Sequence, residues 1–179
     1  MLNRKIAISL AASAVFAASG FSSNVFAATA GTSANVDIVT AIGITKQADP
    51  DFGVIIADVG GDTVTLESDT GNIVVLGGST HQAGTQVVGD FDVNGTANQA
   101  YAITDPGAIT LDGVSGMDVD TWTVTNLNGD CTDLAVASCV PSLDAGGADT
   151  LSIGATLNIP ALQGEGQFSQ AFNLEVLYQ

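Results

Sequence analysis

The chain has 179 residues, 46% of them hydrophobic and 12% charged, with nineteen acidic residues against three basic ones. This charge balance argues against nucleic acid as a partner, because a protein that binds phosphate backbones needs the opposite sign. The length fits one ordinary domain with a substantial core.

The N-terminus has the order of parts typical of a secretory signal peptide. Basic residues near the start are followed by an apolar run, residues 6–18, and by small residues up to Ala27. We therefore predict that residues 1–27 are removed during export, with cleavage before Ala28. The apolar run is short for a membrane span and no later stretch is longer, so we expect no span in the processed chain.

The first strand expected in the processed chain covers residues 36–44. Alternate side chains share one face of a strand. Here that face carries Val36, Ile38, Thr40, Ile42 and Ile44. Residues 46–50 have turn composition. We divide the processed chain into an N-terminal strand segment, residues 28–46, and a domain, residues 47–179.

Short apolar runs separated by turn residues continue through the middle of the chain. They predict strands at residues 52–56, 63–67, 73–76, 86–93, 100–104, 108–111 and 121–125. A tight turn is expected at Asn94 and Gly95. Helical periodicity is not sustained anywhere. The pattern predicts an all-β fold, an immunoglobulin-like antiparallel β-sandwich.

The two last strands have the strongest alternation. Residues 151–159 place an apolar side chain at every second position up to Pro160. After a Gly-rich turn, one face of the C-terminal segment carries Phe168, Phe172, Leu174, Val176 and Tyr178. The chain is therefore expected to end on a strand that is apolar along one face.

The sequence contains no recognisable catalytic centre. His81 is the only histidine, and its Gly- and Ser-rich flanks offer no orienting partner, so we interpret it as a solvated loop residue. We expect no enzyme activity and no cofactor. Cys131 and Cys139 are the only cysteines, and export to an oxidising compartment favours a disulfide between them. A metal site, the alternative, would need further ligands nearby.

Two patterns are compatible with ligand binding. Residues 90–95 begin like a calcium loop, but Tyr101 stands at the twelfth position where a glutamate is needed, so a strand entering a turn is favoured. Trp122 and Tyr101 could stack on a sugar, although a single tryptophan in an apolar run favours a core position. A monomeric binding module for sugar or calcium stays open as an alternative function, and we predict no metal site.

The C-terminus resembles a known signature. Gly166 stands fourteenth from the end and Tyr178 is penultimate. This resembles the C-terminal signature of chaperone-usher pilins, in which the last strand is read by a periplasmic chaperone. Residues 51–53 and 143–147 look like those of a family of exported bacterial β-domains that is similar to the spore-coat-U-like subunits of archaic pili.

The resemblance implies a structural subunit of a fibre or pilus at the cell surface. Copies would join head to tail by donor-strand exchange, with a periplasmic chaperone and an outer-membrane usher as partners. The face from Val36 to Ile44 would be the donor strand, and Gly166 with the face from Phe168 to Tyr178 would line the acceptor groove. A strand that pairs within its own chain explains the same alternation, because alternation does not identify the neighbouring strand.

Overall fold

The computed structural model describes residues 29–126, 134 and 140–179, and these residues form an all-β protein with one short 3-10 turn, Leu111–Gly113. They fall into two units, one ending at Val36 and one running from Asp37 to Gln179. The described part of the first unit, residues 29–36, is exposed and has no regular secondary structure. The described residues include no helix with the length and hydropathy needed to cross a membrane.

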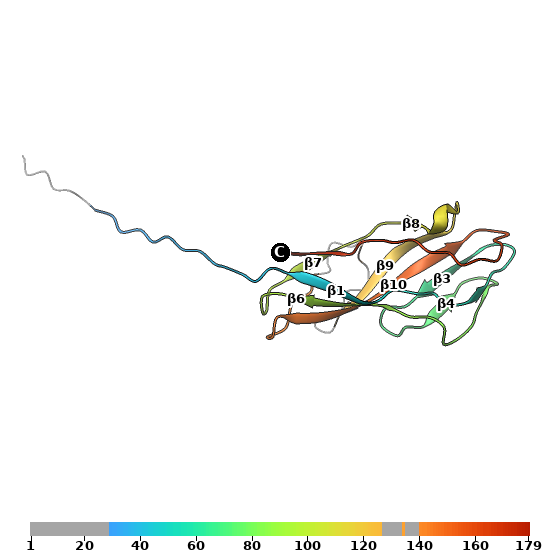
Figure 1. Ribbon diagram of the computed structural model, residues 1–179, viewed down its shortest axis with the longest axis horizontal. Helices are drawn as coiled ribbons and strands as arrows, with labels where there is room; N and C mark the ends of the chain where they lie inside the picture. The colour runs from blue at the N-terminus through green and yellow to red at the C-terminus, as the bar shows by residue number, and fades with distance from the viewer. Residues whose placement is uncertain (1–28, 127–133, 135–139) are drawn as a thin grey trace, which may run out of the picture. The chain divides into compact units, whose positions relative to one another are not determined.

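The second unit is built on a large antiparallel sheet (Figure 1). Its strands are β1 (Gly43–Ala48), β3 (Asp62–Leu66), β4 (Ile73–Val75), β6 (Gly89–Asn94), β8 (Ile109–Thr110), β9 (Asp118–Asn126) and β10 (Ala148–Ile159). β1 pairs with β6, β4 pairs with β3, and β8 pairs with β9. These three are the edge strands of the sheet.

β10 is the central strand of this sheet. β6 pairs with residues 148–153 and β3 with residues 155–159, so the two follow one another along one edge of β10. β9 pairs with residues 151–157 along the opposite edge. The predicted alternation is confirmed, because the apolar positions Leu151, Ile153, Ala155, Leu157 and Ile159 are all buried.

The layer that faces this sheet contains much less paired backbone. It includes β7 (Tyr101–Thr104) paired with β11 (Glu175–Tyr178). A separate short pair is formed by β2 (Ile55–Ile56) and β5 (Thr80–His81). Residues 166–174, ahead of β11, are in no strand. Within that stretch, residues 170–174 form no backbone hydrogen bond with another described backbone group.

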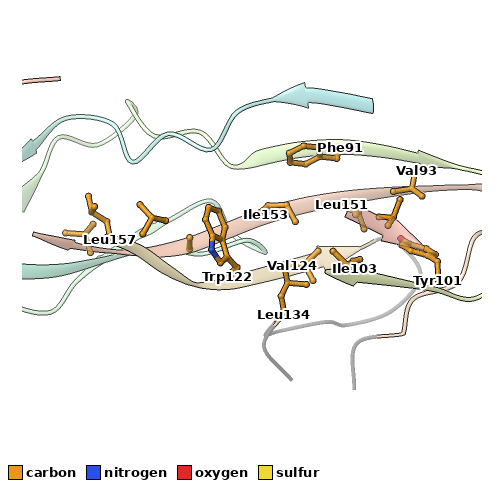
Figure 2. Packing of buried hydrophobic residues seen from close by; sticks show 14 of the residues in the cluster. Phe91, Val93, Tyr101, Ile103, Trp122, Val124, Leu134, Leu151, Ile153 and Leu157 are labelled. Carbon is orange, nitrogen blue, oxygen red and sulfur yellow. The ribbon is translucent and has the colours of Figure 1, made fainter. Parts of the chain in front are cut away.

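The hydrophobic core lies between the two layers. Val93, Val124, Leu151 and Ile153 come from the large sheet, and Ile103 and Val176 come from β7 and β11. Figure 2 shows the side chains from the large sheet together with Ile103, with Leu157 toward one end of the row and Tyr101 toward the other. Two layers of antiparallel strands around one core give the sandwich-like all-β fold that the sequence predicted.

Three local expectations differ from the structure. β1 begins at Gly43 and continues to Ala48 through a bulge, so the expected turn at residue 46 and the expected domain boundary fall inside a strand. Asn94 and Gly95 do not close a hairpin, because β6 and β7 belong to different layers and the chain crosses between them. β5 was not expected, since its two residues lie in a Gly- and Ser-rich stretch.

Truncation of a core side chain on β10 is expected to destabilise the domain strongly. Ile153 is 0% exposed, so Ile153→Ala should lower the free energy of unfolding by about 2–5 kcal/mol, through lost burial and the cavity left behind. Urea unfolding measures the change. Val59→Ala, at an exposed position, is the control and should change it by less than about 0.5 kcal/mol. Equal effects of the two variants would contradict this account of the core.

Candidate functional site: the open flank of the sandwich

The edges of β1 and β11 approach one another without being paired. β1 is hydrogen-bonded to β6 on one side and β11 to β7 on one side, and no described strand pairs with the other side of either. The two strands nevertheless lie near each other, one in each layer. We call this side, with the C-terminal residues 168–178, the open flank.

β1 lines the open flank with one large apolar side chain and one cation. Directly opposed residues of paired strands point to the same face. Ile44 stands opposite the buried Val93, and Lys46 stands opposite the buried Phe91. Ile44 is half-buried against the core, whereas Lys46 points to the same face and keeps 54% of its side chain exposed. A cation on that face indicates that the flank is not sealed.

The C-terminal segment lines the other side of the open flank. Its alternate side chains turn inward as the sequence predicted, since Val176 is buried and the others pack half-buried on the core: Phe168, Phe172, Leu174 and Tyr178. The Phe172 ring lies 4.5 Å from the Trp122 ring, centroid to centroid. Gly166 is exposed and precedes this row. Residues 170–174 are therefore held mainly by side-chain packing.

A cluster of hydroxyl groups closes one end of the open flank. The Tyr178 hydroxyl donates to the Thr40 carbonyl oxygen at 2.7 Å and accepts from the Thr96 backbone N–H at 2.6 Å. The Thr40 backbone N–H donates to the Thr96 hydroxyl at 2.8 Å. We call these three residues the hydroxyl clasp. It joins the penultimate residue to the segment that leads into β1.

The hydroxyl clasp fits because glycine occupies the neighbouring positions. A Cβ at Gly95 would overlap the Tyr178 hydroxyl. Gly147 has a φ of 79°, and a Cβ there would overlap the carbonyl oxygen of Gly95. Asp144 fixes this turn by accepting from the backbone N–H groups of residues 146 and 148. The turn at residues 143–147 therefore packs against Gly95 and supports the hydroxyl clasp at the end of the open flank.

The structure divides the predicted donor strand at Thr40. Ile42 and Ile44 pack half-buried on the core of their own chain. Val36 and Ile38 are 81% and 90% exposed, and Val39 is exposed as well. Residues 29–42 are in no strand. Of the predicted donor face, only Val36 and Ile38 are therefore left without a packing partner among the described residues.

One polar cluster contains residue types that occur in catalytic sites, but its residues are buried away from solvent. Asp149 is 4% exposed, and its Oδ2 accepts from the Tyr101 hydroxyl at 2.8 Å and from the Asn126 amide at 2.9 Å. Burial, with the hydrogen bond to Asp149 and its negative charge, raises the pKa of Tyr101 above its usual range. Because catalysis requires contact with substrate, we interpret this cluster as a structural network.

The other sequence candidates are placed as follows. Asp90 and Asp92 lie in β6, which supports the strand interpretation over the calcium loop. Trp122 and Tyr101 are both buried, so they offer no surface for sugar stacking.

His81 is half-buried in β5 with an unpartnered, buried Nε2, so its interpretation as a solvated loop residue is wrong. The predicted disulfide, Cys131 with Cys139, lies outside the described residues.

Sequence reasoning missed Thr96 and the position of Lys46. Lys46 continues the spacing of Ile42 and Ile44, so extending that alternation by one step would have placed it on the inner face. Thr96 has no such signal, because its role depends on contacts with residues 56 and 82 positions away. The described residues contain no group of three His, Cys, Asp or Glu that could hold a metal ion.

These features define an antiparallel β-sandwich domain with one flank that is not hydrogen-bonded. A family model described as Domain of unknown function (DUF4402) matches residues 42–178, so the chain belongs to this family. No curated protein and no solved structure matches the chain. The family match begins at Ile42, two residues after the Thr40 of the hydroxyl clasp, and ends at Tyr178.

Removal of the Tyr178 hydroxyl is expected to destabilise the end of the open flank. Tyr178→Phe leaves the half-buried Thr96 N–H without its acceptor and should lower the free energy of unfolding by about 1–3 kcal/mol. Urea unfolding and amide hydrogen exchange at Thr96 measure the effect. Leu177→Ala, at the exposed neighbouring position, is the control. Unchanged protection of the Thr96 amide would contradict the hydroxyl clasp.

The Tyr101 cluster should make the domain sensitive to high pH. Tyr101 keeps its proton in the folded state, whereas in the unfolded chain it ionises near its ordinary pKa of about 10. Its contribution is therefore complete below about pH 10 and falls by about 1.4 kcal/mol per pH unit above that value. Urea unfolding at several pH values measures this slope. Tyr101→Phe should flatten it, and an identical slope in that variant would contradict the assignment.

Proposed function

We propose that the chain is an exported structural subunit of an extracellular fibre, in which the N-terminal segment of one copy completes the open flank of the next. The observation that supports this most directly is the pair of free edges on β1 and β11, which border a common core without a strand between them. Free strand edges present unpaired backbone groups that another extended segment can bind. The role is architectural, and no catalytic step is part of it.

The exposed N-terminal residues supply the other half of the proposed contact. Val36, Ile38 and Val39 are large apolar side chains that remain exposed. Transfer of each such side chain from water into a partner is worth about 1.5–3 kcal/mol as an upper bound. Three of them within four positions form an apolar segment that is unfavourable in water and favourable against a second copy.

The hydroxyl clasp determines which residues are available to a neighbour in this proposal. Ile42 and Ile44 pack on their own core, and Thr40 is hydrogen-bonded to Thr96 and Tyr178. The donor therefore ends at Val39, five residues earlier than the alternation alone indicates. Because the donor and the open flank are different surfaces, the contact is head to tail and does not close on itself, which produces a fibre.

Export of the chain, and the chaperone and usher that would assist its assembly, are part of the same proposal. The first 27 residues have the composition of a secretory signal peptide, and the C-terminal row resembles the segment that pilin chaperones read. An unassembled copy with two free edges would pair with any available strand. A periplasmic chaperone that covers the open flank and an outer-membrane usher that exchanges it for the next donor would prevent this. Their genes should lie beside the gene for this chain.

A charge placed on the exposed donor segment is expected to block assembly without affecting folding. Ile38→Asp puts a carboxylate where an apolar side chain would be buried in the neighbour, at a cost of several kcal/mol, while Ile38 is 90% exposed in its own chain. Sedimentation of the purified chain after export measures polymer, and urea unfolding measures stability. Polymer should be lost, and the free energy of unfolding should change by less than about 0.5 kcal/mol.

The matched control carries the same charge at another highly exposed apolar position, outside the proposed contact. Leu76 is 74% exposed and lies just after β4, so Leu76→Asp should assemble like the parent chain. A parent chain that stays monomeric at high concentration would overturn the proposed function. Equal polymer formation by the parent and by Ile38→Asp would overturn it as well.

A further inference from the structure

Two exposed apolar side chains lie at the end of the sandwich opposite the hydroxyl clasp. Val59 is in the turn ahead of β3 and Leu162 is in the turn after β10, and the Leu162 backbone N–H donates to the Val59 carbonyl oxygen at 3.1 Å. Their side chains are 73% and 81% exposed. We call this pair the apolar tip. β10 begins opposite Asn94, beside the clasp, and ends opposite Asp62, so its whole length separates the apolar tip from the clasp end.

The backbone of Leu162 is strained. Its φ of 59° lies in the left-handed region, where the Cβ of a leucine crowds the backbone. The Leu162 side chain is not packed on the core of its own chain, so no burial there offsets this strain. Backbone strain that the surrounding packing does not explain favours a role in a contact with another molecule.

The proposed donor segment is as long as the flank that it would fill. Residues 29–39 equal in number residues 168–178, the C-terminal side of the open flank. An extended segment of this length spans about 36 Å. Thr40 follows directly and is fixed in the hydroxyl clasp of the donor copy, so no linker separates the donor segment from its own domain. The two domains therefore meet at the end of the open flank that receives Val39.

The sizes of the donor side chains favour the end at the apolar tip. The inward face of the donor segment carries only small side chains up to Ala34 and large ones at Val36 and Ile38. Tyr178 of the receiving copy already fills the clasp end of the flank. Nearer the apolar tip, residues 170–174 have no backbone partner among the described backbone groups. The large donor side chains therefore fit best toward the apolar tip, with the donor antiparallel to the C-terminal segment.

The opposite direction would bring two clasp ends together. Val39 of the donor would then lie beside Tyr178 of the receiving copy, whose hydroxyl donates to its own Thr40. The exposed N-terminal segment of the receiving copy begins at that same point. The incoming domain and this segment would compete for one space. Insertion toward the apolar tip instead leaves each donor segment free for the next copy, as a head-to-tail fibre requires.

We propose that the apolar tip of each copy packs against the clasp end of the copy whose donor segment it receives. This inference rests on the proposed function and adds a second, domain-to-domain contact to it. Val59 and Leu162 are covered there by the turn that follows Thr96 in the donor copy, in which Ala97 is exposed. The contact fixes the orientation of neighbouring domains, which an inserted strand alone leaves free to bend.

The variant Leu162→Asn separates assembly from folding. Asparagine adopts the left-handed region more readily than leucine, so the urea midpoint of the domain should stay the same or rise. The lost apolar burial should raise the critical concentration for assembly on the order of tenfold. Sedimentation of the exported full chain measures polymer. Leu76→Asn is the matched control and should assemble like the parent, because Leu76 is 74% exposed and follows β4, two strands from β10.

Pairs of cysteine substitutions test which surfaces meet. The double variant Ala97→Cys/Leu162→Cys places one thiol at the clasp end and one at the apolar tip of every copy. Oxidation of its fibres should give a ladder of covalent oligomers on a non-reducing gel, because a disulfide forms only between residues whose Cα atoms lie within about 7 Å. Neither single variant should give a ladder. Ala97→Cys/Leu76→Cys, with the second thiol beyond β4, is the control and should give none either.

The outcomes separate this inference from the proposed function. If the parent chain polymerises and Ile38→Asp does not, but Leu162→Asn assembles like the parent, the tip contact is overturned and the fibre role stands. A missing ladder in fibres of Ala97→Cys/Leu162→Cys overturns the tip contact as well. If the parent chain stays monomeric, both are overturned. Weaker assembly of Leu162→Asn at an unchanged or raised urea midpoint, together with the ladder, supports the tip contact.

Discussion

The sandwich depends on the hydrogen bonding of β10 along both of its edges. β6 and β3 share one edge in succession, and β9 occupies the other, so one strand sets the register of three neighbours. Its inward side chains, including Leu151 and Ile153, form the middle of the core. A slip of one residue would turn all of these side chains to solvent, and burial therefore enforces the register.

The opposing layer is held in a different way, and this difference creates the open flank. The four residues of β11 pair with β7, whereas residues 170–174 rely on side chains such as Phe172 against Trp122. Hydrophobic packing is strong but leaves backbone N–H and C=O groups without protein partners, which water or another strand can satisfy. An exposed edge of this kind is a hazard in a soluble protein, and the inward-facing Lys46 is one of the devices that limit indiscriminate pairing.

The hydroxyl clasp joins Tyr178, the last residue of the family match, to Thr40, two residues before the match begins. It also separates packed residues from exposed ones. Residues from Ile42 onward pack on the core, and Val36 and Ile38 do not. The Tyr178 hydroxyl lies at this boundary, hydrogen-bonded to Thr40 and Thr96. Its position depends on Gly95, since a side chain there would fill the space that the hydroxyl occupies. The contacts of the folded domain thus determine where the exposed N-terminal segment ends.

The sequence by itself determined the all-β class, the buried positions of β10 and the inward row from Phe168 to Tyr178, because alternation with a period of two is a local property of the chain. Only the tertiary structure decided that β6 and β7 lie in different layers, that the predicted donor strand is divided at Thr40, and that Lys46 faces the core side of an edge strand. It also brought Tyr101, Asn126 and Asp149 together. These features arise from contacts between residues distant in the chain, and local patterns do not specify which strand packs against which.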